Sequence, residues 1–342
     1  MTAAPVILEP LAAEPSVAPS PRRIPGDKLW RALRHNPKAL AGALLLLFFI
    51  VLAVFAGQIA PYDPTLTTFA PGLGPSAAHW LGTTAQGQDV LSQLIWGARQ
   101  TLIIAFAVGG ISCALSVLVG VSAAYLGGIA DGVLSLITDV LLVIPTFPLV
   151  VILAAYLNNA GTLDLIFVLG FVGWPYGARQ LRAQVLSLRN RDFLEAARVR
   201  GERSGYIIVR EVIPTLTSLI VATFLGSAVY AVLAAAGLQF IGLGDPNALS
   251  WGTMLYWAQS NEALQAGMPL WAIMPGLFVA LLGAAFALLN YAFDEISNPA
   301  LRPVRRLART RFVPAGLLEK SGNGSSPTPL VGSALSKDGR GA

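Results

Sequence analysis

The 342-residue sequence is poor in charged residues and in residues that form disulfide frameworks or metal sites. Charged residues make up only 12% of the chain and hydrophobic residues 55%, whereas about a quarter of a soluble globular domain is charged. The single cysteine, Cys113, excludes a disulfide framework and a cluster of thiolate ligands. Neither histidine, His35 or His79, has a neighbour at metal-ligand spacing, so we expect no metal site. This composition indicates a protein that lies in a lipid bilayer.

Motifs for catalysis and nucleotide binding are also missing. A phosphate-binding loop needs a Gly-Lys pair after a glycine-spaced run, yet the four lysines, Lys28, Lys38, Lys320 and Lys337, follow Asp, Pro, Glu and Ser. The sequence contains no set of nucleophile, base and orienting residue. We therefore expect no catalytic site on this chain and no ATP bound by such a loop.

Six apolar runs are candidates for helices that cross the roughly 30 Å of bilayer hydrocarbon. They cover residues 40–59, 101–125, 133–157, 163–177, 215–240 and 269–291. The third run contains Pro145 and Pro148, which should kink it, and the fourth is short for a span. We predict an all-α membrane domain over residues 36–303, preceded by a disordered arm (1–35) without a cleaved signal and followed by a basic, then disordered tail (304–342).

The positions of the positive charges predict the orientation of the six spans. Lys and Arg residues near span ends are retained in the cytoplasm. With the N-terminus inside, residues 1–39, 178–214 and 292–342 lie in the cytoplasm and hold six, eight and eight Lys or Arg, which is 22 of the 23. The basic character of the chain therefore indicates topology, with both termini in the cytoplasm, and not a nucleic-acid partner.

Acidic residues are nearly absent from the predicted spans. Asp139 is the only acid well inside one, whereas a proton-coupled carrier usually has several intramembrane carboxylates or histidines. Asp139 either bonds to a neighbouring helix or takes part in a transport path. Small residues recur four apart, as in Ala105 and Gly109, or Gly120 and Ala124, which allows close contact between helices.

The stretch EAARVRGERSGYIIVREVIP, residues 195–214, predicts a short helix on the cytoplasmic side. We expect Asp192 at its N-cap with Glu195 completing a capping box, and Glu195, Arg198 and Glu202 paired along one side. Phe193, Ala197 and Gly201 should form another side, which a partner surface can approach closely. Gly205 should end the helix. A helix tethered to spans at both ends is suited to docking into a partner.

This stretch resembles the cytoplasmic EAA loop, here about residues 180–214, of permease subunits in bacterial ATP-binding cassette (ABC) importers. The matching positions are Glu195, Ala196, Ala197, Gly201, Ile213 and Pro214. Glu211 is a departure, because the family often has an apolar residue near this end of the loop. In that family the loop seats in a groove of an ATPase subunit. The resemblance implies ATPase coupling through Phe193, Glu195, Ala196, Ala197, Gly201 and Pro214.

Two further stretches are similar to the dipeptide, oligopeptide and nickel branch of this family, and closest to its second permease. They are HWLGTTAQGQDVLSQLIWGAR (residues 79–99) and GLQFIGLGDPNALSWGTML (237–255), and Thr84 and Gln88 depart from the acid and base common in that branch. Outside the membrane, these loops serve either as turns and anchors or as contacts with a substrate-delivering protein. Peptides, short oligosaccharides and metal complexes remain alternatives for the cargo.

The resemblance also implies the fold and the partners. The fold is that of a type I ABC importer permease in the bacterial inner membrane. The partners are a sister permease, two ATPase subunits that hold ATP and Mg, an extracytoplasmic binding protein and membrane lipid. We expect the pathway at the interface with the sister permease, lined by Thr223, Ser227, Tyr230 and Asp139. The alternatives are an ion-coupled secondary carrier or channel, and a scaffold or export-type subunit.

Overall fold

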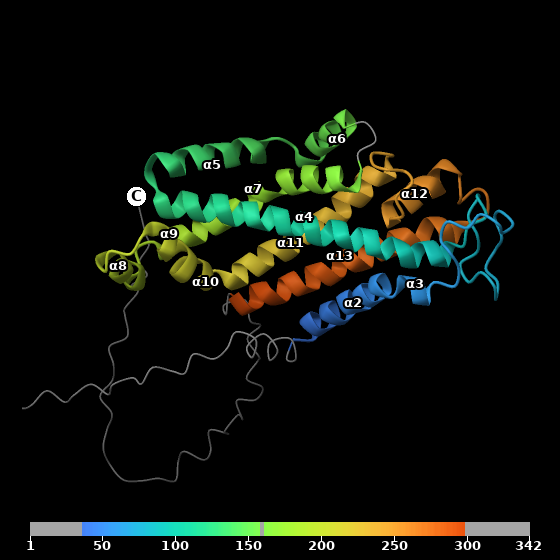
Figure 1. The fold of residues 1–342 in the computed structure, drawn as a ribbon, viewed down its shortest axis with the longest axis horizontal. Helices are drawn as coiled ribbons and strands as arrows, with labels where there is room; N and C mark the ends of the chain where they lie inside the picture. Colours follow the sequence, from blue (N-terminus) through green and yellow to red (C-terminus); the bar gives the residue numbers. More distant parts are fainter. Residues whose placement is uncertain (1–35, 158–160, 298–342) are drawn as a thin grey trace, which may run out of the picture. The chain divides into compact units, whose positions relative to one another are not determined.

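The computed structural model describes residues 36–157 and 161–297, and the regular elements in these ranges are helices (Figure 1). Four of them are long and apolar enough to cross a membrane: α2 (Pro37–Val54), α4 (Val90–Leu126), α11 (Thr217–Phe240) and α13 (Pro269–Ser297). The expectations for residues 1–35 and 304–342 lie outside the described residues. The prediction of an all-helical membrane protein is confirmed.

Helices α5 (Gly128–Val143) and α6 (Thr146–Tyr156) occupy the third predicted span. They are bent by 88° at their junction, and the described residues have five candidate spans if this pair counts as one. The expected kink is therefore a complete break, with Pro145 at the N-cap of α6. Pro148 lies in the first turn of α6, where a missing N–H costs no helical hydrogen bond.

Helix α7 (Thr162–Leu188) is much longer than the fourth predicted run, with 27 residues. It continues through Pro175 and past Arg179 and Arg182. Its first half is apolar and its second half is polar, which explains why an apolar run alone marked only part of it. The shorter helical elements are α3 (Ala56–Ile59), α8 (Asp192–Val199), α9 (Ser204–Ile207), the π-helical turn η1 (Ile208–Val212), α10 (Ile213–Thr215) and α12 (Trp251–Ser260).

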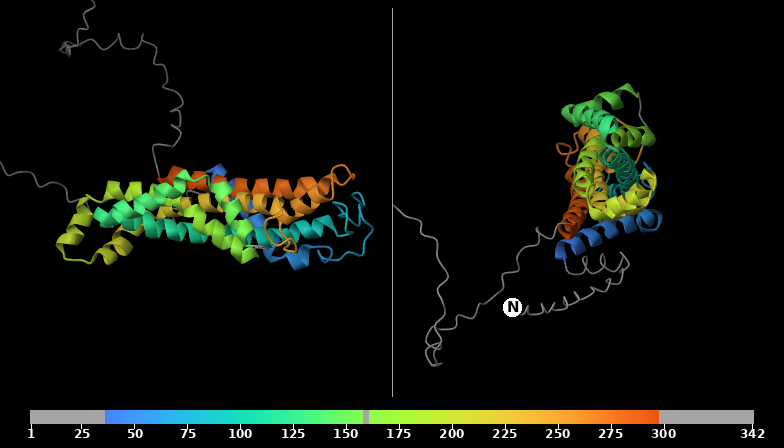
Figure 2. Two further views of the ribbon diagram at one scale, coloured as in Figure 1. Left: turned by 90° about the horizontal axis from the view of Figure 1, so that it is seen from above. Right: turned by 90° about the vertical axis from the view of Figure 1, so that its left-hand side faces the viewer.

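Helix α4 is the central element and packs against α2, α7 and α11. Both figures show α2 and α5 on opposite sides of it (Figures 1 and 2). Its 37 residues give a length of about 55 Å at 1.5 Å per residue, more than the thickness of bilayer hydrocarbon. The helix begins 11 residues before the predicted run because Asp89 caps it, accepting a hydrogen bond from the Ser92 amide at 2.8 Å.

Small residues bring α4 close to its neighbours, as predicted. A Cβ on Gly120 would stand 2.4 Å from the Ala178 carbonyl oxygen of α7, and Gly109 lies against Phe224 of α11. Two serines of α4 add hydrogen bonds to backbone carbonyls of α7. Ser112 Oγ donates to Gly170 at 3.0 Å and Ser116 Oγ to Trp174 at 2.7 Å. Such bonds and close contacts hold helices together where lipid removes the hydrophobic driving force.

Residues 60–89, which we call the first connector, fold back onto the start of α4. Asp63 accepts hydrogen bonds from the Thr65 hydroxyl and amide at 2.6 and 2.8 Å, and these bonds lower the pKa of the Asp63 carboxyl. Gly82 and Gly87 have positive φ angles of 79° and 73° and lie so close to the carbonyls of Leu73 and Phe69 that no Cβ would fit. Positions 82 and 87 therefore require glycine for a conformational reason.

Helix α12 lies at the same end of the helices as the first connector, and α8 lies at the opposite end (Figures 1 and 2). Trp251 of α12 is completely buried and donates from Nε1 to the Leu94 carbonyl of α4 at 2.8 Å. Its indole ring lies against Gly97, where a Cβ would be 2.9 Å from Trp251 Cδ1. This contact joins α12 to the first turns of α4.

Candidate functional site

The stretch EAARVRG lies in the segment between α7 and α11, residues 189–216, which we call the α8–α10 segment. It begins with α8, whose N-cap is Arg191 and whose cap makes no side-chain hydrogen bond. The prediction of Asp192 as N-cap was wrong, because the helix starts one residue earlier. Asp192 and Glu195 instead both lie in the first turn, where carboxylates interact favourably with the positive end of the helix dipole.

Gly201 ends α8 in a backbone conformation that other residues rarely adopt. Its φ is +77°, its amide donates to the Arg198 carbonyl at 2.9 Å, and the Glu202 amide donates to the Ala197 carbonyl at 3.3 Å. These two bonds form the Schellman arrangement that closes many helices. The prediction that Gly205 ends the helix was wrong, because Gly205 lies inside α9.

One side of α8 is buried against the ends of α4 and α7. Leu194 and Ala197 are both 0% exposed. They belong to a hydrophobic cluster with Val121, Ala124, Tyr125, Leu181, Val185, Ile207, Val212 and Leu216. The interpretation that Ala197 shares an open surface with Phe193 and Gly201 was therefore wrong. Helix α8 therefore forms one packed cluster with the ends of α4 and α7.

The opposite side of the α8–α10 segment exposes large apolar side chains. Their exposed fractions are 39% for Phe193, 83% for Val199, 52% for Tyr206 and 59% for Val209. The other predicted coupling residues that are exposed are Glu195, Ala196, Gly201 and Pro214. Several large apolar side chains exposed on one charge-rich segment make this segment a candidate interaction surface.

The charged side chains of this segment pair differently from the prediction. Glu195, Arg198 and Glu202 do not form one row, because α8 ends before Glu202. Glu202 instead bonds to Arg200 at 3.0 Å. The Arg198 guanidinium lies over the ring of Tyr125, 5.4 Å from its centroid. This cation–π contact fastens α8 to the last turn of α4.

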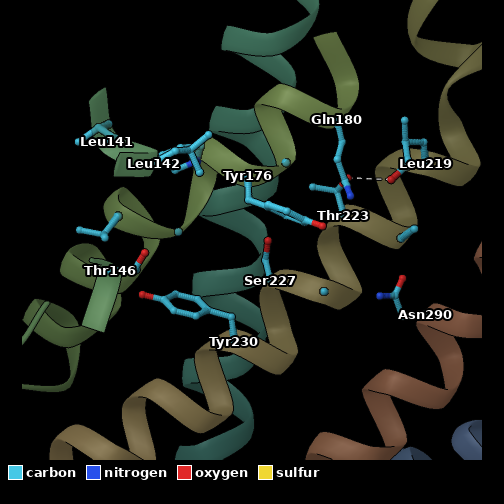
Figure 3. A pocket seen from close by; sticks show the side chains of 16 residues that line it. Leu141, Leu142, Thr146, Tyr176, Gln180, Leu219, Thr223, Ser227, Tyr230 and Asn290 are labelled. Carbon is cyan, nitrogen blue, oxygen red and sulfur yellow. Dashed lines mark hydrogen bonds between the residues drawn. The ribbon is translucent and has the colours of Figure 1, made fainter. Parts of the chain in front are cut away.

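A cavity of about 470 Å³ lies among α5, α6, α7, α11 and α13 (Figure 3). No charged side chain lines it. Its hydroxyl, phenol and amide groups come from Thr146, Tyr176, Gln180, Thr223, Ser227, Tyr230 and Asn290. Within the described ranges, the buried Tyr230 hydroxyl and the buried Asn290 Oδ1 have no hydrogen-bond partner. The cavity can therefore hydrogen-bond a polar solute without supplying a counter-ion.

The structure brings three of the four predicted pathway residues together. Thr223, Ser227 and Tyr230 line the cavity from α11, and Figure 3 shows Ser227 and Tyr230 projecting into it. Asp139 does not line this cavity. It pairs with Arg179 of α7, and both side chains are more than half exposed. Of the two roles considered for Asp139, the contact with a neighbouring helix is the one the structure displays.

A second ion pair links α5 to α7 nearer to the α8–α10 segment. Arg182 Nε lies 2.7 Å from Asp131 Oδ1 and Arg182 Nη2 lies 2.8 Å from Asp131 Oδ2. Two parallel hydrogen bonds of this kind fix geometry as well as charge. Neither Asp131 nor Arg182 stood out in the sequence, because they lie 51 positions apart.

Apolar helices around an uncharged cavity, with an anchored segment at one end, agree with the architecture of a membrane permease. The chain belongs to the family of binding-protein-dependent transport system inner membrane components, whose model matches residues 116–302. The N-terminal TM domain of oligopeptide transport permease C matches residues 25–75. The protein is thus an inner-membrane permease subunit of an ABC importer.

Individual relatives match along nearly their whole length. The oligopeptide transport system permease protein OppC of Mycobacterium tuberculosis is 32% identical over 282 residues, which is 82% of this chain and 96% of the relative. The glutathione transport system permease protein GsiD of Escherichia coli is 32% identical over 295 residues, which is 85% of this chain and 96% of the relative. Permeases of this family work with other permease, ATPase and binding-protein subunits.

Sequence reasoning missed four polar residues of the cavity, namely Thr146, Tyr176, Gln180 and Asn290. Asn290 carried a usable signal, since it is a polar amide near the end of the sixth apolar run and polar groups in spans face a bundle interior or a cavity. Gln180 carried none, because it lies beyond the apolar part of α7. Only the packing of α7 against α11 brings it to the cavity.

Proposed function

We propose that this permease receives the motion of ATPase subunits through the α8–α10 segment. The observation that carries the proposal is that α8 is buried on one side and exposed on the other. Leu194 and Ala197 are completely buried against α4 and α7, while Phe193 and Val199 are exposed. If a groove of a partner held the exposed side, its motion would displace α8, and the buried side of α8 would carry that displacement to the ends of α4 and α7. Phe193, Glu195 and Ala196 offer direct contacts, Ala197 and Gly201 hold the shape, and Pro214 begins the return to α11.

We propose six membrane spans, formed by α2, α4, the α5–α6 pair, α7, α11 and α13, with both termini in the cytoplasm. The distribution of 22 of the 23 Lys and Arg residues supports this orientation. The 27-residue length of α7 and its close packing on α4 support its role as the fourth span. The α8–α10 segment then lies in the cytoplasm, and α12 lies outside with the first connector.

The proposed complex contains a sister permease, a pair of ATPase subunits and an extracytoplasmic binding protein. ATP and Mg bind on the ATPase subunits, since this chain lacks a phosphate-binding loop and a catalytic set. Closure of the ATPases draws the two coupling segments, one from each permease, and exchanges access to the shared pathway between the two sides. This chain contributes half of that pathway.

For the cargo we propose peptides or a similar small polar solute. The names of the two relatives, oligopeptide and glutathione permeases, support this class. The cavity supports it too, because its hydroxyl and amide groups match the hydrogen-bonding groups of a peptide backbone. Thr223, Ser227 and Tyr230 are the residues we assign to the pathway.

An ion-coupled carrier is the alternative function. It would require titratable groups in the path, but the cavity lining has none with a carboxylate or imidazole. Transport by proteoliposomes that contain this chain alone, driven by a proton or sodium gradient without ATP, would favour the carrier.

The experiment compares Gly201→Asp with Gly205→Asp in the assembled importer. Both glycines are exposed and neither would bring a Cβ within 4 Å of another group, so the two variants add the same charge to the same surface. Only Gly201 needs a positive φ. We expect Gly201→Asp to insert in the membrane but to lose copurification with the ATPases or to uncouple ATP hydrolysis from uptake, and Gly205→Asp to be less affected. Full uptake by Gly201→Asp would refute the proposal.

A further inference from the structure

A second cavity, of about 350 Å³, lies at the end of the helices that is opposite to α8. Its walls come from the first connector, the start of α4, the loop before α12, α12 itself and the start of α13. The side chains that matter for its chemistry are Gln86, Gln88, Gln93, Asn247, Trp257 and Trp271. It shares no lining residue with the cavity around Tyr230.

The lining of this second cavity combines polar and apolar side chains and contains no charged one. Gln93 Nε2 donates to Gln88 Oε1 at 2.7 Å and lies 3.4 Å from the Pro64 carbonyl oxygen. These contacts fix the two amides at the base of the cavity.

Three other polar groups of the cavity differ in their exposure. Gln86 and Asn247 are exposed, and their side-chain amides make no hydrogen bond to any residue that the structure describes, so both amides are open to a solute. Trp271 is 2% exposed, and its Nε1 also lacks a partner within the described ranges. A buried donor without a partner costs about 1–3 kcal/mol, so such a group at a cavity is a candidate for bonding a ligand.

The second cavity also has an aromatic wall, formed by Trp257. Trp257 is 38% exposed and lies on the cavity wall, held by a hydrogen bond from its Nε1 to the Pro246 carbonyl at 3.0 Å. An indole held in place offers a flat apolar face at little cost in conformational entropy. Amide groups beside aromatic faces suit solutes that combine neutral polar groups with compact apolar surface.

We propose that this cavity binds a small neutral solute that presents carbonyl or hydroxyl oxygens, of the size of a short capped peptide or one sugar ring. Its volume lies at the lower end of the range of ligand pockets, about 300–1,000 Å³. The solute accepts a hydrogen bond from Trp271 Nε1, exchanges hydrogen bonds with the Gln86 and Asn247 amides, and packs on Trp257. The proposal rests on the proposed function only for its placement on the extracytoplasmic side.

The experiment measures binding of three probes to the full chain in lipid nanodiscs by saturation-transfer NMR. The probes are N-acetyl-glycyl-glycinamide, glucose and the zwitterion glycylglycine. We expect saturable binding of at least one neutral probe and markedly weaker binding of the zwitterion, because no charged side chain lines the cavity. Binding of the capped peptide alone identifies a peptide-type ligand, and binding of glucose alone a sugar-type ligand.

Three variants test whether binding takes place in this cavity. Trp271→Phe removes an unpartnered N–H and keeps most of the apolar ring, and Gln86→Leu removes one amide of similar size. Each should weaken binding roughly two- to tenfold, the range that the loss of one hydrogen bond gives. Gln259→Leu is the matched control, since Gln259 is exposed on α12 but does not line the cavity, and it should bind like the unmodified protein.

The inference is overturned if neither neutral probe binds, if glycylglycine binds as tightly as they do, or if Trp271→Phe and Gln86→Leu both bind like the control. No ATPase subunit is present in this assay, so its failure leaves the coupling proposal intact. Gly201→Asp should bind the probes normally, which separates a failure of coupling from a failure of this site.

Discussion

His79 Nδ1 lies 2.9 Å from Asp89 Oδ1, and both side chains are buried. The second oxygen of Asp89 accepts hydrogen bonds from the amide and hydroxyl of Ser92 at 2.8 and 2.7 Å. One carboxylate therefore caps α4 and holds the first connector on top of it. This double role gives a physical reason for the presence of both residues in the stretch that resembles related permeases.

Replacing Asp89 by Ala should loosen the first connector and the first turn of α4 together. The change removes a helix cap, which typically contributes about 1 kcal/mol, and leaves His79 buried without its partner, at a cost of about 1–3 kcal/mol. Hydrogen exchange in nanodiscs should show faster exchange over residues 60–92. Asp63→Ala is the control, because among the residues that the structure describes its carboxylate bonds only to the exposed Thr65. Equal exchange in the two variants would contradict this account.

Gly201→Ala and Gly205→Ala should change stability in opposite directions. Alanine at position 201 must adopt a φ of +77°, which costs roughly 1 kcal/mol. Alanine at position 205 lies within α9 and should stabilise it by up to about 1 kcal/mol. Limited proteolysis of residues 189–216 measures both effects. More rapid cleavage of the Gly205 variant than of the Gly201 variant would show that the helix end is assigned wrongly.

Gly120→Ala should separate α4 from α7, whereas Gly110→Ala should be tolerated. The new methyl group at position 120 would lie 2.4 Å from the Ala178 carbonyl oxygen, while a methyl group at position 110 meets no group within 4 Å. Overpacking of this kind costs about 1–3 kcal/mol. Thermal unfolding in nanodiscs should show a lower midpoint for Gly120→Ala only. A midpoint equal to that of Gly110→Ala would contradict the close contact.

The two ion pairs between α5 and α7 should differ in strength. Asp131 holds Arg182 with two hydrogen bonds and is 20% exposed, whereas Asp139 is 57% exposed and holds Arg179 through one. Double-mutant cycles with Asp131→Asn and Arg182→Gln should give a coupling of about 1 kcal/mol, and the corresponding cycle for Asp139 and Arg179 a value near zero. A larger coupling for the second pair would reverse the assignment.

The sequence predicted where the membrane helices lie but not how their surfaces are used. Apolar runs marked the four helices that are long and apolar enough to cross a membrane, α2, α4, α11 and α13, because lipid imposes the same requirement along a whole helix. The burial of Ala197 was not predictable, since it depends on Tyr125 and Leu181, which are distant in sequence. The start of α4 was missed because residues 90–100 are less apolar than the rest of the helix and only the cap at Asp89 marks their beginning.

Site-specific cross-linking from Val199 tests the coupling claim most directly. A photoreactive amino acid replaces Val199, which is 83% exposed on α8, and in a second variant it replaces Gln259 of α12. After irradiation of the assembled importer, we predict an adduct of the Val199 variant with an ATPase subunit and no such adduct from Gln259. An ATPase adduct from Gln259, or an adduct of the Val199 variant with the extracytoplasmic binding protein, would contradict the account.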